Sequence, residues 1–277
     1  MAGRAVYSMR KHGPTDSHNQ HRIAFPKLAN EVIRISDIVL QVLDARFLQE
    51  TRNLELEKLI KTQGKFLINV INKTDLVNIS DLQKNPALSS LWPYVIFSCS
   101  KRIGLGKLRE RIKIEVKRFG VKHSKAHVGV IGYPNTGKSA LINLLAGGSR
   151  ARTSPEAGFS KGIQKIRFNK DILILDTPGV IPSKENATIS SLDLKKHAEI
   201  GVKTYDKVKN PDFIVLGILQ KNPGLFERYY KTESQGDVEI FLDDLGRKRK
   251  LYKIGGNVDI DRIARIVLRD WQEGKIK

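Results

Sequence analysis

The segment of residues 132–139 carries the most recognisable chemistry in this chain. It reads Gly132-Tyr133-Pro134-Asn135-Thr136-Gly137-Lys138-Ser139, the pattern of a phosphate-binding loop. Glycines let backbone N–H groups turn toward phosphate oxygens, the Lys138 ammonium can reach the β- and γ-phosphates, and the Ser139 hydroxyl can ligate Mg²⁺. A buried-strand pattern precedes the motif and a helical pattern follows it, as such a loop requires. The segment therefore predicts a nucleoside triphosphate site.

A second motif, Asp176-Thr177-Pro178-Gly179, ends an expected strand. The Asp176 carboxylate can hold the Mg²⁺ shell through water, and the Gly179 N–H can meet the γ-phosphate. The same residues also make an ordinary Asp–Pro–Gly turn. The motif therefore indicates a Mg²⁺ site only in combination with the phosphate loop.

A third group of residues is suited to a nucleobase. In Asn72-Lys73-Thr74-Asp75, the Asp75 carboxylate can accept the N1–H and N2–H₂ donors of guanine, whereas adenine presents a different pattern. Asn72 would brace the base and tie loops together, and the Lys73 stem would lie on the face of the base. The backbone of Ser98-Cys99-Ser100 could reach the guanine O6. Read alone, Asn-Lys-Xaa-Asp is also typical of a plain helix cap.

Alternating strand and helix patterns position these motifs. From residue 26 to about 180 they are typical of an α/β domain with a mostly parallel sheet. Strands are expected at 38–43, 66–71, 95–97, 128–131, 164–168 and 172–175, and helices at 27–35, 54–62, 105–119 and 138–146. Residues 169–171 are expected to be a hairpin loop. Helical patterns follow at 192–202, 213–219, 225–230, 238–245 and 260–271.

Charge points to the class of partner. The chain has 49 Lys and Arg against 29 Asp and Glu, a net charge of +20, and basic residues gather at 101–125 and 247–250. Each Lys or Arg brought to a phosphate releases counterions, so nucleic acid is the leading expected partner. The alternative is a generally basic, soluble surface.

The same composition bounds the location. The longest apolar runs fall well short of the ~20 residues that a bilayer helix needs, so no membrane partner is expected. The first residues lack the apolar stretch of a secretory signal. One cysteine, Cys99, fits a reducing compartment. We therefore expect a cytoplasmic protein.

Together the motifs resemble those of TRAFAC-class GTPases in a circularly permuted order. The guanine motif and base loop (G4, G5) precede the phosphate loop (G1), the switch segment (G2) and the Mg²⁺ motif (G3). This order resembles the YlqF/YawG family, also called RbgA-like, which acts in assembly of the large ribosomal subunit. Asp44-Ala45-Arg46, Thr51-Arg52-Asn53 and residues 242–276 resemble further segments of that family.

The resemblance implies an α/β fold in which a circularly permuted P-loop GTPase domain is followed by an all-helical domain. The implied division is a basic N-terminal tail at 1–22, the GTPase domain at 23–182, and a helical, RNA- or ribosome-binding domain at 183–277. The implied function is hydrolysis of GTP to GDP and phosphate, with GTP-gated binding to rRNA of the large ribosomal subunit. We expect a monomer.

The resemblance also assigns site residues. The Mg²⁺ ligands would be Ser139, Asp176 and Ser160, a serine where the family has a G2 threonine. The base loop reads Ser98-Cys99-Ser100 where Ser-Ala-Lys is usual, so its backbone contacts are expected without those of the lysine. The implied GTP-binding residues are Asn72, Lys73, Asp75, Ser98, Cys99, Ser100, Asn135, Thr136, Gly137, Lys138, Ser139, Ala140, Asp176 and Gly179.

Catalysis would depend on Lys138, Asn135, Ser160 and Gly179. Val180 stands where Ras-like enzymes place a water-orienting Gln, and an apolar side chain cannot orient water, so slow intrinsic hydrolysis is expected. Asn135 occupies the place of an asparagine ligand in related K⁺-dependent GTPases, so K⁺ is a candidate substitute. The alternative is an Asn that serves a tight backbone.

Other functions stay open. A nucleotide-dependent RNA-binding scaffold with negligible turnover also fits Val180, and a permuted GTPase could act on transfer RNA or the small subunit. Trp92 and Trp271 are expected to anchor a core or an interface, with base stacking as the alternative.

Overall fold

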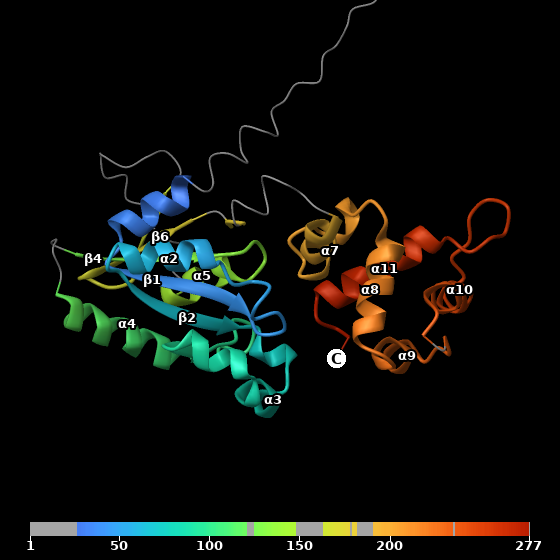
Figure 1. Cartoon of the computed structure of the whole chain (residues 1–277), viewed down its shortest axis with the longest axis horizontal. Helices are drawn as coiled ribbons and strands as arrows, with labels where there is room; N and C mark the ends of the chain where they lie inside the picture. The colour runs from blue at the N-terminus through green and yellow to red at the C-terminus, as the bar shows by residue number, and fades with distance from the viewer. Residues whose placement is uncertain are drawn as a thin grey trace, which may run out of the picture.

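A six-stranded sheet forms the centre of the first part of the molecule. The computed structural model describes residues 27–120, 125–147, 163–177, 179–181, 191–234 and 236–276 (Figure 1). The strand order is β3-β2-β1-β4-β6-β5. The parallel strands are β1 (Ile38–Asp44), β2 (Phe66–Asn72), β3 (Tyr94–Ile96), β4 (Ala126–Gly132) and β6 (Ile172–Asp176), and β5 (Gln164–Arg167) pairs antiparallel with β6.

Helices cover both faces of this sheet. The helix at residues 27–35 and α2 (Leu54–Thr62) pack on one face, whereas α4 (Leu105–Phe119) and α5 (Lys138–Leu145) pack on the other. Figure 1 shows α2 above and α4 below β1 and β2. Because successive side chains of a strand point to opposite faces, both faces of the inner strands need apolar residues. The apolar residues of β1 on either side of Gln41 provide them, since Ile38, Leu40 and Val42 join one core and Val39 the other.

A short helical excursion lies between β2 and β3. It consists of the 3₁₀ helix Thr74–Leu76, α3 (Ile79–Lys84) and the 3₁₀ helix Pro86–Leu91. The side chains of Asn78 and Asn85 accept hydrogen bonds from the backbone of Ser80 and Ala87, which starts the last two helices. This excursion was absent from the sequence prediction because its turns are too short to show an amphipathic period.

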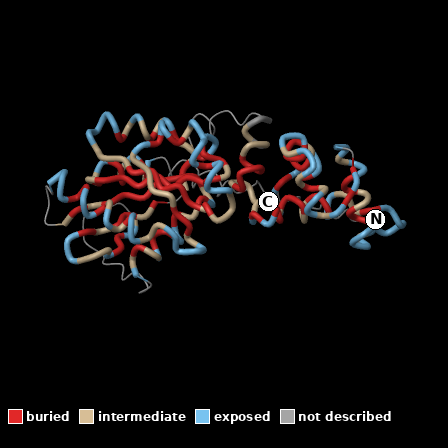
Figure 2. Tube along the Cα trace, turned by 90° about the horizontal axis from the view of Figure 1, so that it is seen from below, coloured by how far each residue is buried: buried red, intermediate tan, exposed pale blue. Residues whose placement is uncertain are grey.

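The second part of the molecule is helical. It contains α7 (Ser191–Glu199), a 3₁₀ turn (Tyr205–Lys207), α8 (Pro211–Lys221), α9 (Leu225–Tyr230), α10 (Val238–Lys248) and α11 (Ile260–Gln272). Its own core centres on Phe226, Phe241 and Trp271, and Phe47 and Tyr133 of the first part reach into that core. Figure 2 shows buried residues concentrated in the strands of the first part and along the helices of the second.

Most elements agree with the prediction. The hairpin at 169–171 is confirmed, because β5 and β6 pair antiparallel on either side of it. The helix expected at 192–202 instead ends at Glu199, and Gly201 follows with φ 79°. The N-terminal tail at 1–22 lies outside the described residues. Within the described ranges, no helix is both long and apolar enough to cross a membrane.

Two glycines give a matched test of this packing. A Cβ at Gly129 of β4 would lie 2.5 Å from Ser36 Oγ and 2.8 Å from Val32 Cγ1, whereas a Cβ at Gly106 of α4 would meet nothing within 4 Å. We expect Gly129→Ala to lower the free energy of unfolding by about 1–3 kcal/mol through overpacking. Gly106→Ala should raise it by about 0.5–1 kcal/mol through helix propensity. Urea unfolding measures both, and an unchanged stability of Gly129→Ala would contradict the packing of helix 27–35 on β4.

Candidate nucleotide-binding site

The predicted motifs meet at one edge of the sheet. Asp44, Asn72, Gly132 and Asp176 are the last residues of parallel strands, and Asp44 lies opposite Asn72 in the register of β1 and β2. In open α/β sheets, ligands bind outside the carboxyl ends of the strands. The permuted order in the chain therefore does not separate the motifs in space.

The phosphate loop forms the turn between β4 and α5. Gly137 has φ 102°, and a Cβ at Gly132 would come within 2.6 Å of Val42 O, so both positions require glycine. Lys138 Nζ and Thr136 Oγ1 both donate to Tyr133 O, at 2.7 Å and 2.9 Å. These bonds hold the loop in a tight turn with Lys138 folded over it.

The segment after β6 lies directly against this loop. A Cβ at Gly179 would lie 2.8 Å from Pro134 Cα, and the Val180 N–H donates to Gly132 O at 3.1 Å. The Val180 side chain is 2% exposed and packs with the apolar residues of helix 27–35 and α2. Val180 therefore points into the core, away from the phosphate loop.

A cavity of about 380 Å³ lies between the loop and β6. Burial raises the pKa of Asp176, while the nearby Lys138 ammonium opposes the shift. Asp176 Oδ1 is buried and has no hydrogen-bond partner within the described part of the chain. The cavity is lined by Pro134, Asn135, Lys138, Ser139, Gln164, Asp176, Thr177 and Gly179.

This donor set fits Mg²⁺. The hydroxyl of Ser139 and the unsatisfied carboxylate oxygen of Asp176 share the cavity, and Mg²⁺ prefers such oxygen ligands. The third predicted ligand, Ser160, lies outside the described residues. Gln164 also lines the cavity and was not predicted, because nothing in a strand of four residues marks its first residue as facing a site.

Lys138 is the buried cation of the site. It is 7% exposed, and burial lowers its pKa to about 8, although the Asp176 carboxylate acts in the opposite direction. A buried ammonium without full charge compensation favours an anionic ligand. The site is therefore prepared electrostatically for a phosphate chain.

Asn72 connects the base side of the site to the phosphate side. Its Nδ2 donates to Thr136 O at 2.8 Å, and its Oδ1 accepts from the Cys99 N–H at 3.1 Å. A Cβ at Gly137 would collide with the Asn72 amide. One buried side chain thus fixes the guanine motif, the base loop and the phosphate loop relative to one another.

Two serines orient the Asp75 carboxylate. Ser98 Oγ donates to Asp75 Oδ1 at 2.6 Å, and Ser100 Oγ donates to Asp75 Oδ2 at 2.7 Å. A carboxylate has about four lone-pair sites, so both oxygens keep the capacity to accept a further bond. Ser100, the residue that departs from the usual lysine of the base loop, here fixes the direction of the carboxylate.

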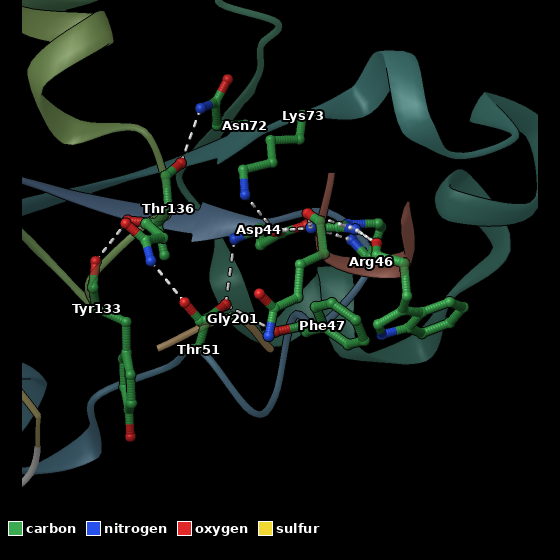
Figure 3. A network of polar contacts seen from close by, with 12 residues as sticks. Asp44, Arg46, Phe47, Thr51, Asn72, Lys73, Tyr133, Thr136 and Gly201 are labelled. Atoms are coloured by element: carbon green, nitrogen blue, oxygen red, sulfur yellow. Dashed lines mark hydrogen bonds and ion pairs between the residues drawn. The ribbon is translucent and has the colours of Figure 1, made fainter. Parts of the chain in front are cut away.

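Asp44 is a site residue whose role the sequence did not reveal. It is buried at the end of β1, where Arg46 binds it through two nitrogens, with Nη2–Oδ2 at 2.8 Å, and Lys73 Nζ lies 2.9 Å from Oδ2 (Figure 3). Burial acts to raise the pKa of Asp44, but Arg46 and Lys73 together outweigh it and hold the pKa below its usual value. The sequence signal that could have indicated this role is a charged residue at the end of an otherwise largely apolar strand.

The same network reaches the helical part. Arg46 Nη1 donates to Trp271 O at 3.0 Å, at the end of α11, where this carbonyl also accepts from the Gly274 N–H. From the phosphate loop, Asn135 Nδ2 donates to Gly201 O at 2.5 Å. Both halves of the nucleotide site therefore contact the helical part directly.

Base recognition can be tested at Asp75. Asp75→Asn removes the carboxylate that would accept two guanine donors, and we expect GTP affinity to fall by roughly 10- to 150-fold, the range of a charged hydrogen bond of about 1.5–3 kcal/mol. The asparagine amide can donate to the xanthine O2, so xanthosine triphosphate should bind better than to the parent chain. Titration calorimetry with both nucleotides measures this. Asp81→Asn, on exposed α3, is the control, and equal GTP affinity in both variants would contradict the assignment.

The pKa of Lys138 gives a second test. A bound phosphate chain raises this pKa above about 8, so GTP binding at pH 8 should take up about half a proton. The contribution of the Lys138 charge to affinity is then complete below pH 8 and is lost as the pH rises from 8 through the higher pKa of the bound state. Calorimetry in two buffers of different ionisation enthalpy measures the uptake. Lys138→Arg, which does not titrate there, should show none, and uptake equal in both proteins would refute this origin.

The comparisons with known proteins agree with this geometry. Residues 127–237 match the family described as 50S ribosome-binding GTPase. A GTP-binding protein of Methanocaldococcus jannaschii, described as uncharacterized, is 37% identical over 92% of this chain and 66% of its own length. Nucleolar GTP-binding protein 2 of Neurospora crassa is 34% identical over 89% of this chain and 40% of its own length. The chain thus spans less than two thirds of these relatives.

A solved structure covers both parts of the molecule. The GDP-bound structure of YlqF from T. maritima has a TM-score of 0.61 and 25% identity, and it matches 90% of this chain and 95% of its own. Because the match extends over 90% of this chain, it includes most of the sheet and most of the helices that follow. Taken with the phosphate loop and the guanine motif at one sheet edge, these likenesses show that the chain belongs to the circularly permuted GTP-binding proteins of the YlqF type, with a P-loop GTPase domain.

Proposed function

We propose that this protein hydrolyses GTP to GDP and phosphate and serves as an assembly factor for the large ribosomal subunit through GTP-gated binding to rRNA. The observation that carries the proposal is the Asn72 side chain, which joins the guanine motif to the phosphate loop through Thr136 O and to the base loop through the Cys99 N–H. The ribosome-binding family match and the net charge of +20 support the partner.

In the proposed reaction, Ser139, Asp176 and Ser160 hold Mg²⁺, which neutralises charge on the phosphates. Lys138 binds the β- and γ-phosphate oxygens, and the Gly179 N–H meets the γ-phosphate. Gly137 and Ala140 contribute backbone N–H groups at the start of α5.

The group that orients water must come from outside this part of the site. Val180 is buried in the core and cannot reach a phosphate. Because Asn135 Nδ2 donates to Gly201 O, its amide oxygen is the group available to K⁺. We propose K⁺ at Asn135 and contact with the ribosomal particle as the sources of the missing stabilisation.

The burial of Val180 also favours a second candidate function. A scaffold that loads GTP and binds RNA would need the same nucleotide site without a water-orienting residue. Action on a different RNA, such as transfer RNA or that of the small subunit, is the variant within the GTPases. We keep a cytoplasmic monomer as the proposed state, since "nucleolar" describes the fungal relatives, of which this chain spans about half or less.

The deciding experiment is the GTP hydrolysis rate in potassium buffer with and without purified large ribosomal subunits. We expect a slow basal rate and at least a roughly tenfold stimulation by the particle, about 1.4 kcal/mol in the barrier. Sodium buffer tests K⁺, and Lys138→Ala, which loses the phosphate contact, controls for contaminating hydrolases.

Two other outcomes would replace the proposed function. A flat rate with tight GTP binding would overturn the hydrolase in favour of the scaffold. Stimulation by small subunits or transfer RNA, but not by large subunits, would assign a different RNA.

A further inference from the structure

The two tryptophans have opposite environments. Trp271 is 8% exposed and stacks on Phe226 at 5.6 Å between ring centroids, so it anchors the helical core as expected. Trp92 is 71% exposed and lies outside every apolar core of the described residues. A large apolar side chain left in solvent next to a charged helix is a candidate contact for a partner.

Neighbouring residues fix the position of Trp92. It follows the 3₁₀ helix Pro86–Leu91 and precedes β3, the edge strand of the sheet, and its ring is perpendicular to that of Tyr94, with the centroids 6.0 Å apart. The guanidinium of Arg111 lies over its ring, 5.9 Å from the centroid. Arg111 is itself fixed by the carboxylate of Glu115, which is 1% exposed, at 3.0 Å. These contacts therefore hold the exposed indole in a defined position.

Helix α4 continues this surface with positive charge. Lys107, Arg111, Ile114 and Arg118 follow one line along the helix, by the spacing of 3 and 4 residues. Between residues 101 and 119, Glu110 is the only exposed acidic residue. The exposed cations there are Lys101, Arg102, Lys107, Lys113, Lys117 and Arg118.

This surface is separate from the helical part. Figure 1 shows α4 on the opposite side of the sheet from α2 and away from α8 to α11. It does adjoin the nucleotide site, because the base loop is joined to the start of α4 by a bridge between Ser98 and Ile103. A ligand at the start of α4 therefore lies next to the base loop.

We propose that Trp92 and the exposed face of α4 form a binding surface for an unpaired segment of RNA, in which one base stacks on the indole and the following phosphates contact the cations of α4. The inference rests on the proposed RNA partner and names where it binds. Stacking of a base on an aromatic ring and a cationic track for the backbone are the two components of single-strand recognition. An apolar protein partner fits less well, since the neighbours of Trp92 include the exposed Ser89 and Ser90 and the Arg111 guanidinium.

The tryptophans themselves supply the test. Because Trp271 is buried, quenching of the intrinsic fluorescence by a single-stranded RNA decamer reports on Trp92. We expect strong quenching in the full chain and none in Trp92→Leu, whose RNA affinity should be lower by roughly 5- to 150-fold. Trp92→Phe keeps an aromatic ring and should bind within about threefold of the parent chain.

The charged half of the surface has its own readout. Lys107→Ala and Arg118→Ala should each lower the slope of log affinity against log salt by about 1. Lys58→Ala, an exposed lysine of α2 on the other face of the sheet, should leave it unchanged. An equal effect of all three variants would show that RNA affinity depends on the overall positive charge of the protein and not on α4, and it would overturn the proposal.

Other outcomes also decide. Equal quenching by duplex RNA would overturn stacking, and equal binding and quenching by poly-L-glutamate would point to an acidic protein partner instead. Failure of this surface is distinguishable from failure of the proposed function. If large subunits stimulate hydrolysis but the decamer does not quench Trp92, only this inference fails. If the decamer quenches but no ribosomal particle stimulates hydrolysis, the proposed function fails and the surface stands.

Discussion

The buried carboxylate of Asp44 is the constraint on which the arrangement of the molecule depends. An ionised group at the end of a buried strand must be paired, and loss of one partner of such a pair typically costs about 3–5 kcal/mol. Its partners are Arg46 and Lys73, so the charge is satisfied only when the guanine motif is folded against β1. Since Arg46 also donates to Trp271 O, the same requirement fixes the end of α11. One charge therefore joins the sheet, the base site and the helical part.

A second connection leaves the phosphate side of the site. Asn135 Nδ2 donates to Gly201 O, and Lys196 Nζ lies 3.4 Å from the Tyr133 hydroxyl. In the proposed function, a ligand that changes the phosphate loop changes these contacts, whereas a ligand at the base acts through Lys73 and Asp44. A nucleotide shifts the position of the helical part only to the extent that it binds two arrangements with different affinity. The contacts identify where that difference would arise.

The sequence was sufficient for the strands and long helices, because segments rich in apolar residues such as Ile38–Leu43 can be buried on both faces only inside a covered sheet. It could not show that Ser98 and Ser100 bind opposite oxygens of Asp75, since residues 23 and 25 positions apart meet only in the fold. Nor could it show the pairing of Asp44 with Lys73. Trp92 was expected to anchor a core or an interface, and its 71% exposure excludes the core.

Permutation changes the connections between elements while the chemistry at the sheet edge stays in place. Parallel strands bring their carboxyl ends to one edge whatever their order in the chain, so Asn72 meets Thr136 although the guanine motif comes first. What the order does change is the segment that follows the Mg²⁺ motif. Here the chain passes from Gly179 to Val180, whose N–H and side chain are both fixed against the sheet, and only residues 181–190 separate Val180 from α7. In the proposed function, a γ-phosphate contact at Gly179 is therefore adjacent in sequence to the helical part, whereas in an unpermuted order a different segment would follow the Mg²⁺ motif.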